Sequence, residues 1–177
     1  MEKESGVISF IHQAYKLKNI DRAGWVKRGI ESSEKISDHS FGTALLALIL
    51  TPEGMDSKKT VNMALSHDFA ESIVGDIIPA DGVSKEEKYL LEKKAMTDMT
   101  ALLDNSNELL SLWEEFEAKE TDEAKFVGCL DKLEMMFQAH EYGISQPRVN
   151  LDDFWEDTKN FDFGKVQQIY NQLRGLK

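Results

Sequence analysis

The sequence has few of the features that mark secreted or membrane-spanning proteins. It contains a single cysteine, Cys129, so no intrachain disulfide can form, and a reducing compartment fits that composition. Its longest apolar run covers residues 44–50, which is far too short to cross a bilayer. The first ten residues lack the basic and long apolar regions of a secretory signal. We therefore expect a cytoplasmic protein without a membrane segment.

The sequence also lacks long clusters of lysine and arginine. With 32 acidic against 21 basic residues, its formal net charge is -11. The resulting field repels nucleic-acid phosphates and anionic lipids, which disfavours a nucleic-acid polymer as a partner. A small anionic substrate is compatible with this charge, because a bound cation and one or two arginines can invert the potential inside a pocket.

Strand patterns are missing as well, since no run alternates apolar and polar residues over the length of a strand. The three prolines, Pro52, Pro79 and Pro147, each lie in an expected connection between helices. A chain of 177 residues can bury roughly 70% of its unfolded surface in one core. We expect an all-α fold that forms a single domain over residues 1–177.

Helical periodicity recurs along most of the chain. The expected helices cover residues 5–18, 37–50, about 59–74, 84–103, 109–116, 121–143 and about 163–173. Caps are expected at Ser37, Ser84 and Thr121, and Gly75 is expected to end the central helix. The helix from Ser37 carries an apolar face of Phe41, Leu45, Leu48 and Ile49. The helix from Thr121 has an expected buried stripe of Phe126, Leu130, Leu133, Met136 and Phe137.

An adjacent His67-Asp68 pair stands inside the apolar stretch of residues 64–79. If this stretch is one helix, Glu71 lies one turn further on, over both residues. Burying one imidazole and two carboxylates costs several kcal/mol unless they are compensated, and a divalent cation is the simplest compensator. The pair therefore suggests a metal site. The alternative is a satisfied buried histidine beside two carboxylates that face solvent.

Two further residues of the same chemistry stand on other expected helices: His39 on the second and Asp131 on the helix 121–143. Together with His67 and Asp68 they offer two imidazole nitrogens and two carboxylate oxygens. This donor set suits one divalent transition metal, with Mn, Fe, Co, Ni and Zn all admissible. The spacing is too long for a local motif, so its meaning depends on the fold.

Several segments resemble the HD-domain metal-dependent phosphohydrolases, whose signature is His, His-Asp, Asp. The matching segments are SDHS, HDFAESIVGD and LDKL. The finer features RAGWVKRG, HDFAESIVGDIIP and SKEEK resemble the 5'-deoxynucleotidase branch. Together these segments cover residues from about 20 to 135. The resemblance implies a helical bundle with one divalent ion at its centre, held by His39, His67, Asp68 and Asp131.

The resemblance also implies roles for other residues. Glu71 matches an acidic residue that handles protons near the attacking water, and Asp76 matches a second essential carboxylate that protonates the leaving 5'-oxygen or positions water. From the residue pattern alone, Asp76 after Gly75 could instead cap a turn.

Arg22 and Trp25 match residues that grip the phosphate and sense the sugar. Some members have Arg followed directly by Trp, whereas Ala23 and Gly24 intervene here. The sequence therefore leaves open whether Arg22 or Arg28 holds the phosphate, and Trp25 could equally serve core packing.

These observations predict a metal-dependent phosphomonoesterase that converts deoxyribonucleoside 5'-monophosphates to deoxyribonucleosides and phosphate. One alternative is an HD-type phosphohydrolase that acts on a triphosphate, a cyclic nucleotide or an alarmone. Another is a non-catalytic regulator that binds metal or nucleotide, which would be favoured if Glu71 and Asp76 pointed away from the metal. The resemblance and the apolar tail segment with Phe154 and Trp155 also suggest a homodimer.

Overall fold

The computed structural model describes residues 5–104, 106–157 and 160–176, and every regular element within them is a helix. The prediction of an all-α fold is confirmed. In these ranges the only β contact is an isolated bridge between Asp21 and Lys35. The α-helices are α1 Gly6–Ala14, α2 Ala23–Lys27, α3 Ile36–Leu50, α4 Ser57–Ser66, α5 Glu71–Val74, α6 Lys85–Thr100, α7 Ser106–Ala118, α8 Asp122–Ser145, α9 Asp152–Asp157 and α10 Gly164–Arg174. No described helix is both long and apolar enough to span a bilayer.

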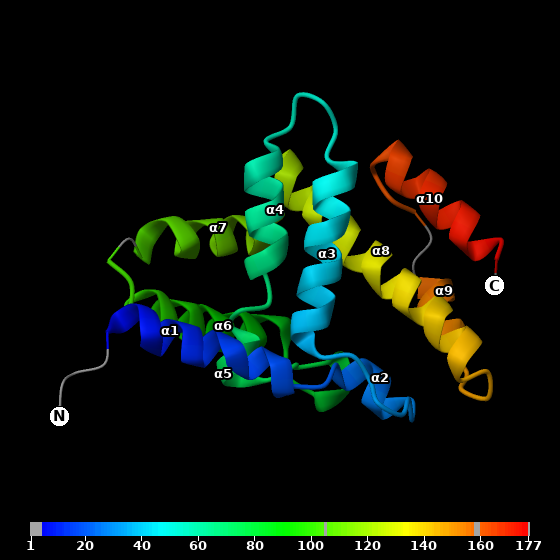
Figure 1. The fold of residues 1–177 in the computed structure, drawn as a ribbon, viewed down its shortest axis with the longest axis horizontal. Helices are drawn as coiled ribbons and strands as arrows, with labels where there is room; N and C mark the ends of the chain where they lie inside the picture. Colours follow the sequence, from blue (N-terminus) through cyan, green and yellow to red (C-terminus); the bar gives the residue numbers. More distant parts are fainter. Residues whose placement is uncertain (1–4, 105, 158–159, 177) are drawn as a thin grey trace.

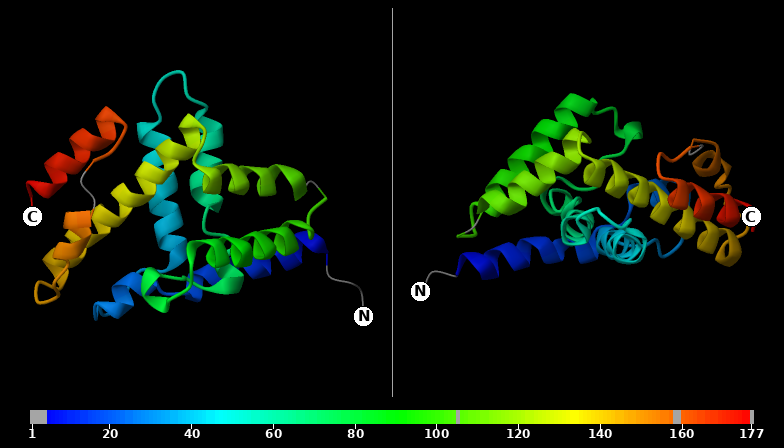
Figure 2. Two further views of the ribbon diagram at one scale, coloured as in Figure 1. Left: turned by 180° about the vertical axis from the view of Figure 1, so that it is seen from behind. Right: turned by 90° about the horizontal axis from the view of Figure 1, so that it is seen from above.

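Helix α8 is the central element of the bundle. It packs against the α3–α4 pair and also contacts α7 and α10 (Figure 1). Helices α1, α6 and α7 lie toward one end of the molecule and α9 and α10 toward the other, so α1 and α10 are far apart (Figure 2). A residue in the middle of α8 therefore lies within reach of α3, of α4 and of the segment that follows α4.

The buried stripe of α8 largely matches the sequence prediction. Phe126, Leu130, Leu133 and Met136 are each at most 1% exposed. Burying a side chain of this size contributes roughly 1.5–3 kcal/mol, so this stripe is a major part of the core. The prediction for Phe137 was wrong, because it is 36% exposed. Its position directly after Met136 rotates it by about 100° around the helix, away from the stripe.

Helix α3 buries a different face from the apolar one that its sequence suggests. Phe41 and Leu48 are 67% and 68% exposed, and Leu45 and Ile49 also lie at the surface. The buried face carries Ile36, His39, Ser40, Thr43 and Ala47. These residues follow the i, i+3, i+4, i+7 spacing of one helical face, and that face is turned toward α4 and α8. The orientation of α3 thus leaves large apolar side chains exposed and places His39 in the interior.

The central helix expected over residues 59–74 is interrupted. Helix α4 ends at Ser66, residues 67–70 form a turn, and the short α5 begins at Glu71. The indole Nε1 of Trp113 donates a hydrogen bond to the carbonyl oxygen of His67 (3.1 Å), which supplies a partner that a continuous helix would otherwise provide. Gly75 ends α5 with a positive φ of 81°, as predicted for a glycine at a helix C-terminus.

The other predicted boundaries hold only in part. Ser84 and Thr121 cap α6 and α8 as expected, each accepting a backbone N–H of the first turn. Helix α3, however, starts at Ile36 with Lys35 in the capping position, so the cap predicted at Ser37 was wrong. The helix expected over residues 5–18 is α1 followed by a 3-10 turn over Tyr15–Asn19. Three further helices differ from their expected bounds by two or three residues: α6 ends at Thr100 rather than at residue 103, α7 covers Ser106–Ala118 rather than 109–116, and α8 ends at Ser145 rather than at residue 143.

Residues 20–35 form a closed loop that contains α2. The Arg22 N–H donates to the Glu34 carbonyl oxygen (3.1 Å), and the Ile36 N–H donates to the Ile20 carbonyl oxygen (3.0 Å). These two bonds tie the start of the loop to its end, at the N-terminus of α3. Arg22 is therefore held close to the helix that carries His39.

Candidate metal centre and active site

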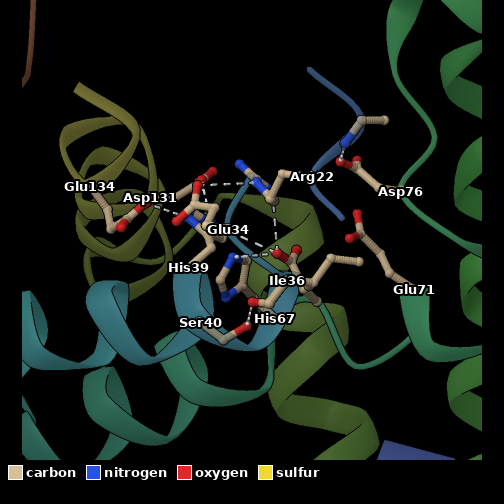
Figure 3. A network of polar contacts seen from close by, with 12 residues as sticks. Arg22, Glu34, Ile36, His39, Ser40, His67, Glu71, Asp76, Asp131 and Glu134 are labelled. Carbon is tan, nitrogen blue, oxygen red and sulfur yellow. Dashed lines mark hydrogen bonds and ion pairs between the residues drawn. The ribbon is translucent and has the colours of Figure 1, made fainter. Parts of the chain in front are cut away.

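Four side chains predicted to bind metal come together where α3, α8 and the α4–α5 turn meet. His39 Nε2 lies 3.2 Å from Asp131 Oδ1 and 3.7 Å from Asp68 Oδ2. His67 Nε2 lies 3.3 Å from the same Asp68 oxygen. Figure 3 shows His39, His67 and Asp131 directed toward one another. The fold therefore brings together residues that are far apart in the sequence.

Each histidine is held through its other ring nitrogen. His39 Nδ1 lies 2.5 Å from Glu134 Oε2, and His67 Nδ1 lies 2.7 Å from the Ala64 carbonyl oxygen. A carbonyl oxygen can only accept, so Nδ1 of His67 carries the proton and its Nε2 offers a lone pair. Both Nε2 atoms therefore face the shared cluster, and partners behind a histidine of this kind are what fix a metal ligand in place.

Three polar atoms of the cluster are buried without a hydrogen-bond partner: His39 Nε2, His67 Nε2 and Asp68 Oδ2. Leaving such atoms unpaired is costly, and here all three point into one small volume that Asp131 also faces. Two imidazole nitrogens and two carboxylates at this separation are a donor set that fits one divalent cation. The residues present therefore fit the ion that their types suggested.

The electrostatics of the cluster favour positive charge. Burial and the Arg22 guanidinium disfavour the imidazolium of His39, yet the Asp131 and Glu134 carboxylates outweigh them and raise its pKa to about 10. Burial opposes ionisation of Asp131, but His39 holds its pKa well below the usual range. Burial lowers the pKa of His67, which stays neutral. In the absence of a metal ion, a proton on His39 thus supplies positive charge that partly balances the Asp131 and Glu134 carboxylates.

Arg22 lies against the cluster. Its side chain is 16% exposed, and its Nη1 is 3.7 Å from Asp68 Oδ2, while its Nε is 4.0 Å from Glu34 Oε1. Burial disfavours its charge, but the surrounding carboxylates, Asp68 and Asp131 first, raise its pKa further above the usual range. A permanently charged guanidinium therefore lies beside the candidate metal ligands.

Glu71 also faces the site. It does so from the start of α5, after the turn of residues 67–70, and not from a helix continuous with α4. It is 4% exposed, its Oε2 has no hydrogen-bond partner, and Lys88 Nζ is 3.9 Å from its Oε1. Burial and the neighbouring Asp68 and Asp76 carboxylates raise its pKa well above the usual range. It lines a cavity together with His67 and Asp68. A raised pKa makes the carboxylate form of Glu71 a stronger base than an ordinary glutamate.

Asp76 has a structural role that the sequence did not indicate. Its Oδ2 accepts a hydrogen bond from the Ala23 N–H (2.7 Å), so it fastens the Arg22 loop to the segment after α5 (Figure 3). It also lines a cavity of about 480 Å³ whose other walls include Arg22, Trp25, Arg28, Pro79 and Phe154.

Trp25 and Arg28 are placed differently from Arg22. Trp25 is 1% exposed, and its Nε1 donates to Glu34 Oε1 (2.7 Å), so the indole N–H is already engaged. Arg28 pairs with Asp153 (3.0 Å) and lies over the Phe154 ring, at 4.2 Å from its centroid. Of the two arginines, only Arg22 has an ion pair with a candidate metal ligand among the described residues.

Two residues close to the cluster were missed from the sequence. Glu134 lies three residues after Asp131 on α8, a spacing that places both on one face and could have revealed it. Glu34 lies behind it, and burial followed by the Glu134 carboxylate raises the pKa of Glu34 to about 7. Gly42, in the interior of α3, leaves room for Glu134, because an added Cβ would meet its Cγ at 2.8 Å.

Comparison with known proteins places this arrangement in a family. The model of the HD domain matches residues 14–170. The crystal structure of PH0347 from Pyrococcus horikoshii superposes with a TM-score of 0.81 at 32% identity, covering 96% of this chain and 99% of that one.

Curated relatives extend over the same range. The mouse 5'-deoxynucleotidase HDDC2 is 39% identical over 173 residues, which are 96% of this chain and 87% of that protein. The zebrafish protein of the same name is 45% identical over 156 residues, covering 86% of this chain and 78% of the relative. This chain belongs to the HD-domain family and, within it, to the branch of the 5'-deoxynucleotidases.

Proposed function

We propose that this protein hydrolyses deoxyribonucleoside 5'-monophosphates to deoxyribonucleosides and phosphate in a metal-dependent reaction. The relatives named 5'-deoxynucleotidase support this substrate class. The observation that carries the proposal is the convergence of four buried or half-buried metal-binding side chains beside a charged arginine. Glu71 lines the same cavity as His67 and Asp68, which favours an enzyme over a non-catalytic regulator.

The metal ligands in this proposal are His39, His67, Asp68 and Asp131. When bound, a divalent ion supplies Lewis acidity toward a phosphoryl oxygen and activates water. The nitrogen and oxygen donors suit Mn, Fe, Co, Ni or Zn. The protein contributes fixed imidazole orientations, through Glu134 and the Ala64 carbonyl group, and a buried environment in which charges act strongly.

The catalytic carboxylates have separate tasks. Glu71 takes the proton of the attacking water, because its carboxyl group faces the ligands and its pKa is raised by burial and by nearby carboxylates. Asp76 holds the Arg22 loop through the Ala23 N–H and leaves its second oxygen for the leaving 5'-oxygen or a water.

Substrate binding divides between the two arginines. Arg22 contacts the phosphate, since it lies against Asp68, while Arg28 and Phe154 contact the nucleoside at the far end of the 480 Å³ cavity. A volume of this size is in the range of small-molecule sites. Trp25 shapes the cavity wall through its ring rather than through its N–H group, which Glu34 occupies.

We also propose that residues 1–177 form one HD domain in the cytoplasm and that two copies associate. The tail segment does not support association, because Trp155 is 3% exposed and packs inward. The exposed apolar face of α3, with Phe41, Leu45, Leu48 and Ile49, is a better candidate surface. Light scattering measures the molar mass of the native chain and of Leu48→Glu. A native molar mass equal to that of one chain would exclude a dimer.

The decisive experiment measures phosphate release by chelator-treated protein reloaded with Mn, Co, Ni, Fe or Zn. The substrates are matched deoxyribo- and ribonucleoside 5'-monophosphates. We expect metal-dependent release from the deoxy series and much slower release from the ribo series. Absence of release from every monophosphate, with metal bound, would contradict the proposal and favour triphosphates, cyclic nucleotides or alarmones as substrates.

A further inference from the structure

A second cavity opens onto the candidate metal ligands. It shares no lining residue with the 480 Å³ cavity that is proposed to hold the nucleoside, which is called the nucleoside cavity below. Its volume is about 340 Å³, and one wall is formed by His67, Asp68 and Asp131. The remaining walls carry three lysines, Lys85, Lys88 and Lys119, three carboxylates, Glu71, Glu92 and Glu117, and the rings of Tyr89 and Phe116. The second cavity therefore reaches the candidate ligands directly, whereas the nucleoside cavity reaches them through Arg22, which pairs with Asp68.

Binding of a phosphate dianion here requires side-chain cations. A divalent ion held by two carboxylates and two neutral imidazoles forms a unit with no net charge, and the chain as a whole carries -11. Long-range attraction for an anion is therefore weak, and nearby cations must supply it. Arg22 is one such cation, but it lines the nucleoside cavity and not the second one.

Among the three lysines of the second cavity, Lys119 is the one that combines a desolvated ammonium group with the absence of an ion pair among the described residues. Lys88 pairs with Glu92 at 3.4 Å and approaches Glu71 at 3.9 Å. Lys85 is exposed in the first turn of α6. Lys119 has no ion pair with any carboxylate that the structure describes, and its ammonium group lies over the Phe116 ring instead. That ring in turn packs against His67, with centroids 5.0 Å apart.

The backbone directs Lys119 toward the cavity. Lys119 follows the last residue of α7 and has a positive φ of 52°, a conformation that glycine usually adopts at this point of a helix end. Its N–H donates to the carbonyl oxygens of Glu115 and Phe116, both at 3.3 Å, so the chain turns back on itself. On the opposite side the Lys119 side chain lies against Gly128 of α8, where an added Cβ would be 3.4 Å from Lys119 Cε.

We propose that Lys119 is a phosphate-binding residue of this enzyme, which holds the phosphoryl group of the substrate and the released phosphate from the second cavity, whose walls do not include Arg22. The proposal rests on the function proposed above. Although the residue as a whole is exposed, burial of its charged end lowers the pKa of Lys119 to about 8, against the attraction of Asp131 and Glu117. An anion beside the ammonium group would offset this desolvation.

The test compares Lys119→Met, which keeps the apolar stem over Phe116, with Lys119→Arg and with Lys125→Met. Lys125 is an exposed lysine on α8 and serves as the matched control for loss of one charge. Affinity for inorganic phosphate is measured by calorimetry on Mn-loaded protein, alongside KM, kcat, metal content and melting temperature. We expect Lys119→Met to weaken phosphate binding and raise KM by about 10- to 100-fold with metal content unchanged.

Lys119→Arg should recover most of the phosphate affinity, and Lys125→Met should lose little. Equal losses in the two methionine variants, or unchanged phosphate affinity in Lys119→Met, would overturn the proposal. A fall in metal content and melting temperature in both Lys119→Met and a further variant, Lys119→Gln, would assign a structural role to Lys119 and would also overturn the proposal. Because phosphate binding is measured without a nucleotide, failure of the substrate assignment alone leaves the predicted difference between the variants intact.

Discussion

His39 and His67 present the same atom, Nε2, to the same cluster, but the groups behind the two rings differ. Behind His39 lies the Glu134 carboxylate at 2.5 Å, and behind His67 lies the Ala64 carbonyl oxygen at 2.7 Å. A full negative charge increases the basicity of an imidazole more than a carbonyl dipole does. Asp131 in front of the ring and Glu134 behind it raise the pKa of His39 to about 10 against burial and Arg22, whereas burial lowers the pKa of His67.

This difference separates two tasks within one ligand set. The metal-free protein keeps a proton on His39, which balances the surrounding carboxylates, while His67 is ready to bind without losing a proton. Side-chain support can be altered by mutation, but the Ala64 carbonyl group belongs to the backbone of α4. The comparison can therefore be tested from the His39 side.

The largest effect is expected from removing either ring. His67→Ala and His39→Ala should each lose the bound ion and lower phosphate release by more than about a thousandfold, because the remaining donors leave charged groups uncompensated. Elemental analysis of purified variants together with phosphate release provides the measurement. A variant that keeps one ion per chain would show that its histidine is not a ligand.

Glu71→Gln tests the catalytic step without removing a proposed metal ligand. This side chain faces the cluster without being one of the four proposed ligands, so the variant should keep its metal while turnover falls about 100- to 1,000-fold. Metal content and kcat are measured on the same preparation. Near-normal kcat would remove Glu71 from the mechanism.

Glu134→Gln addresses the difference between the histidines directly. The amide keeps the shape but removes the charge behind His39, and the loss of such a partner lowers metal affinity by about 10- to 100-fold. Competition with a chromogenic chelator measures the affinity. Glu141→Gln, an exposed change on the same helix, serves as the control, and equal affinities of the two variants would contradict the role of Glu134.

The two histidines also predict a pH dependence. The folded-state pKa of His39, about 10, lies above its ordinary value of 6.5, so its contribution to the stability of the metal-free protein is present below 6.5 and lost as pH rises through 10. Metal binding must displace this proton, so affinity should rise by about tenfold per pH unit between these values. Calorimetry at pH 8 in buffers of different ionisation enthalpy should detect one proton released per ion. Release of no proton would contradict the assignment.

The smallest effect is expected from Gly42→Ala. Alanine favours a helix by about 1 kcal/mol, but its Cβ would displace Glu134 from its place against His39. We expect metal affinity to fall by a few-fold while the melting temperature of the metal-free protein changes little. Unchanged affinity would show that Glu134 reaches His39 by another rotamer.

The sequence alone predicted the all-α class, most helix starts and the residues that converge. Caps such as Ser84 and Thr121 act through bonds within a few residues, which a local pattern records. The break after Ser66 was missed because the group that stabilises it, the Trp113 indole, is distant in sequence. The orientation of α3 was also missed, because both of its faces carry apolar residues and only its partners α4 and α8 decide which one is buried.

The position of the ligands has a consequence for how the chain resists unfolding. His39, His67 and Asp131 belong to three segments that are far apart in sequence, so one ion would crosslink them as a disulfide does in proteins with more than one cysteine. An ion at a hundred times its Kd adds about 2.7 kcal/mol to the free energy of unfolding. The supply of metal would then set the lifetime of the protein against proteases as well as its activity.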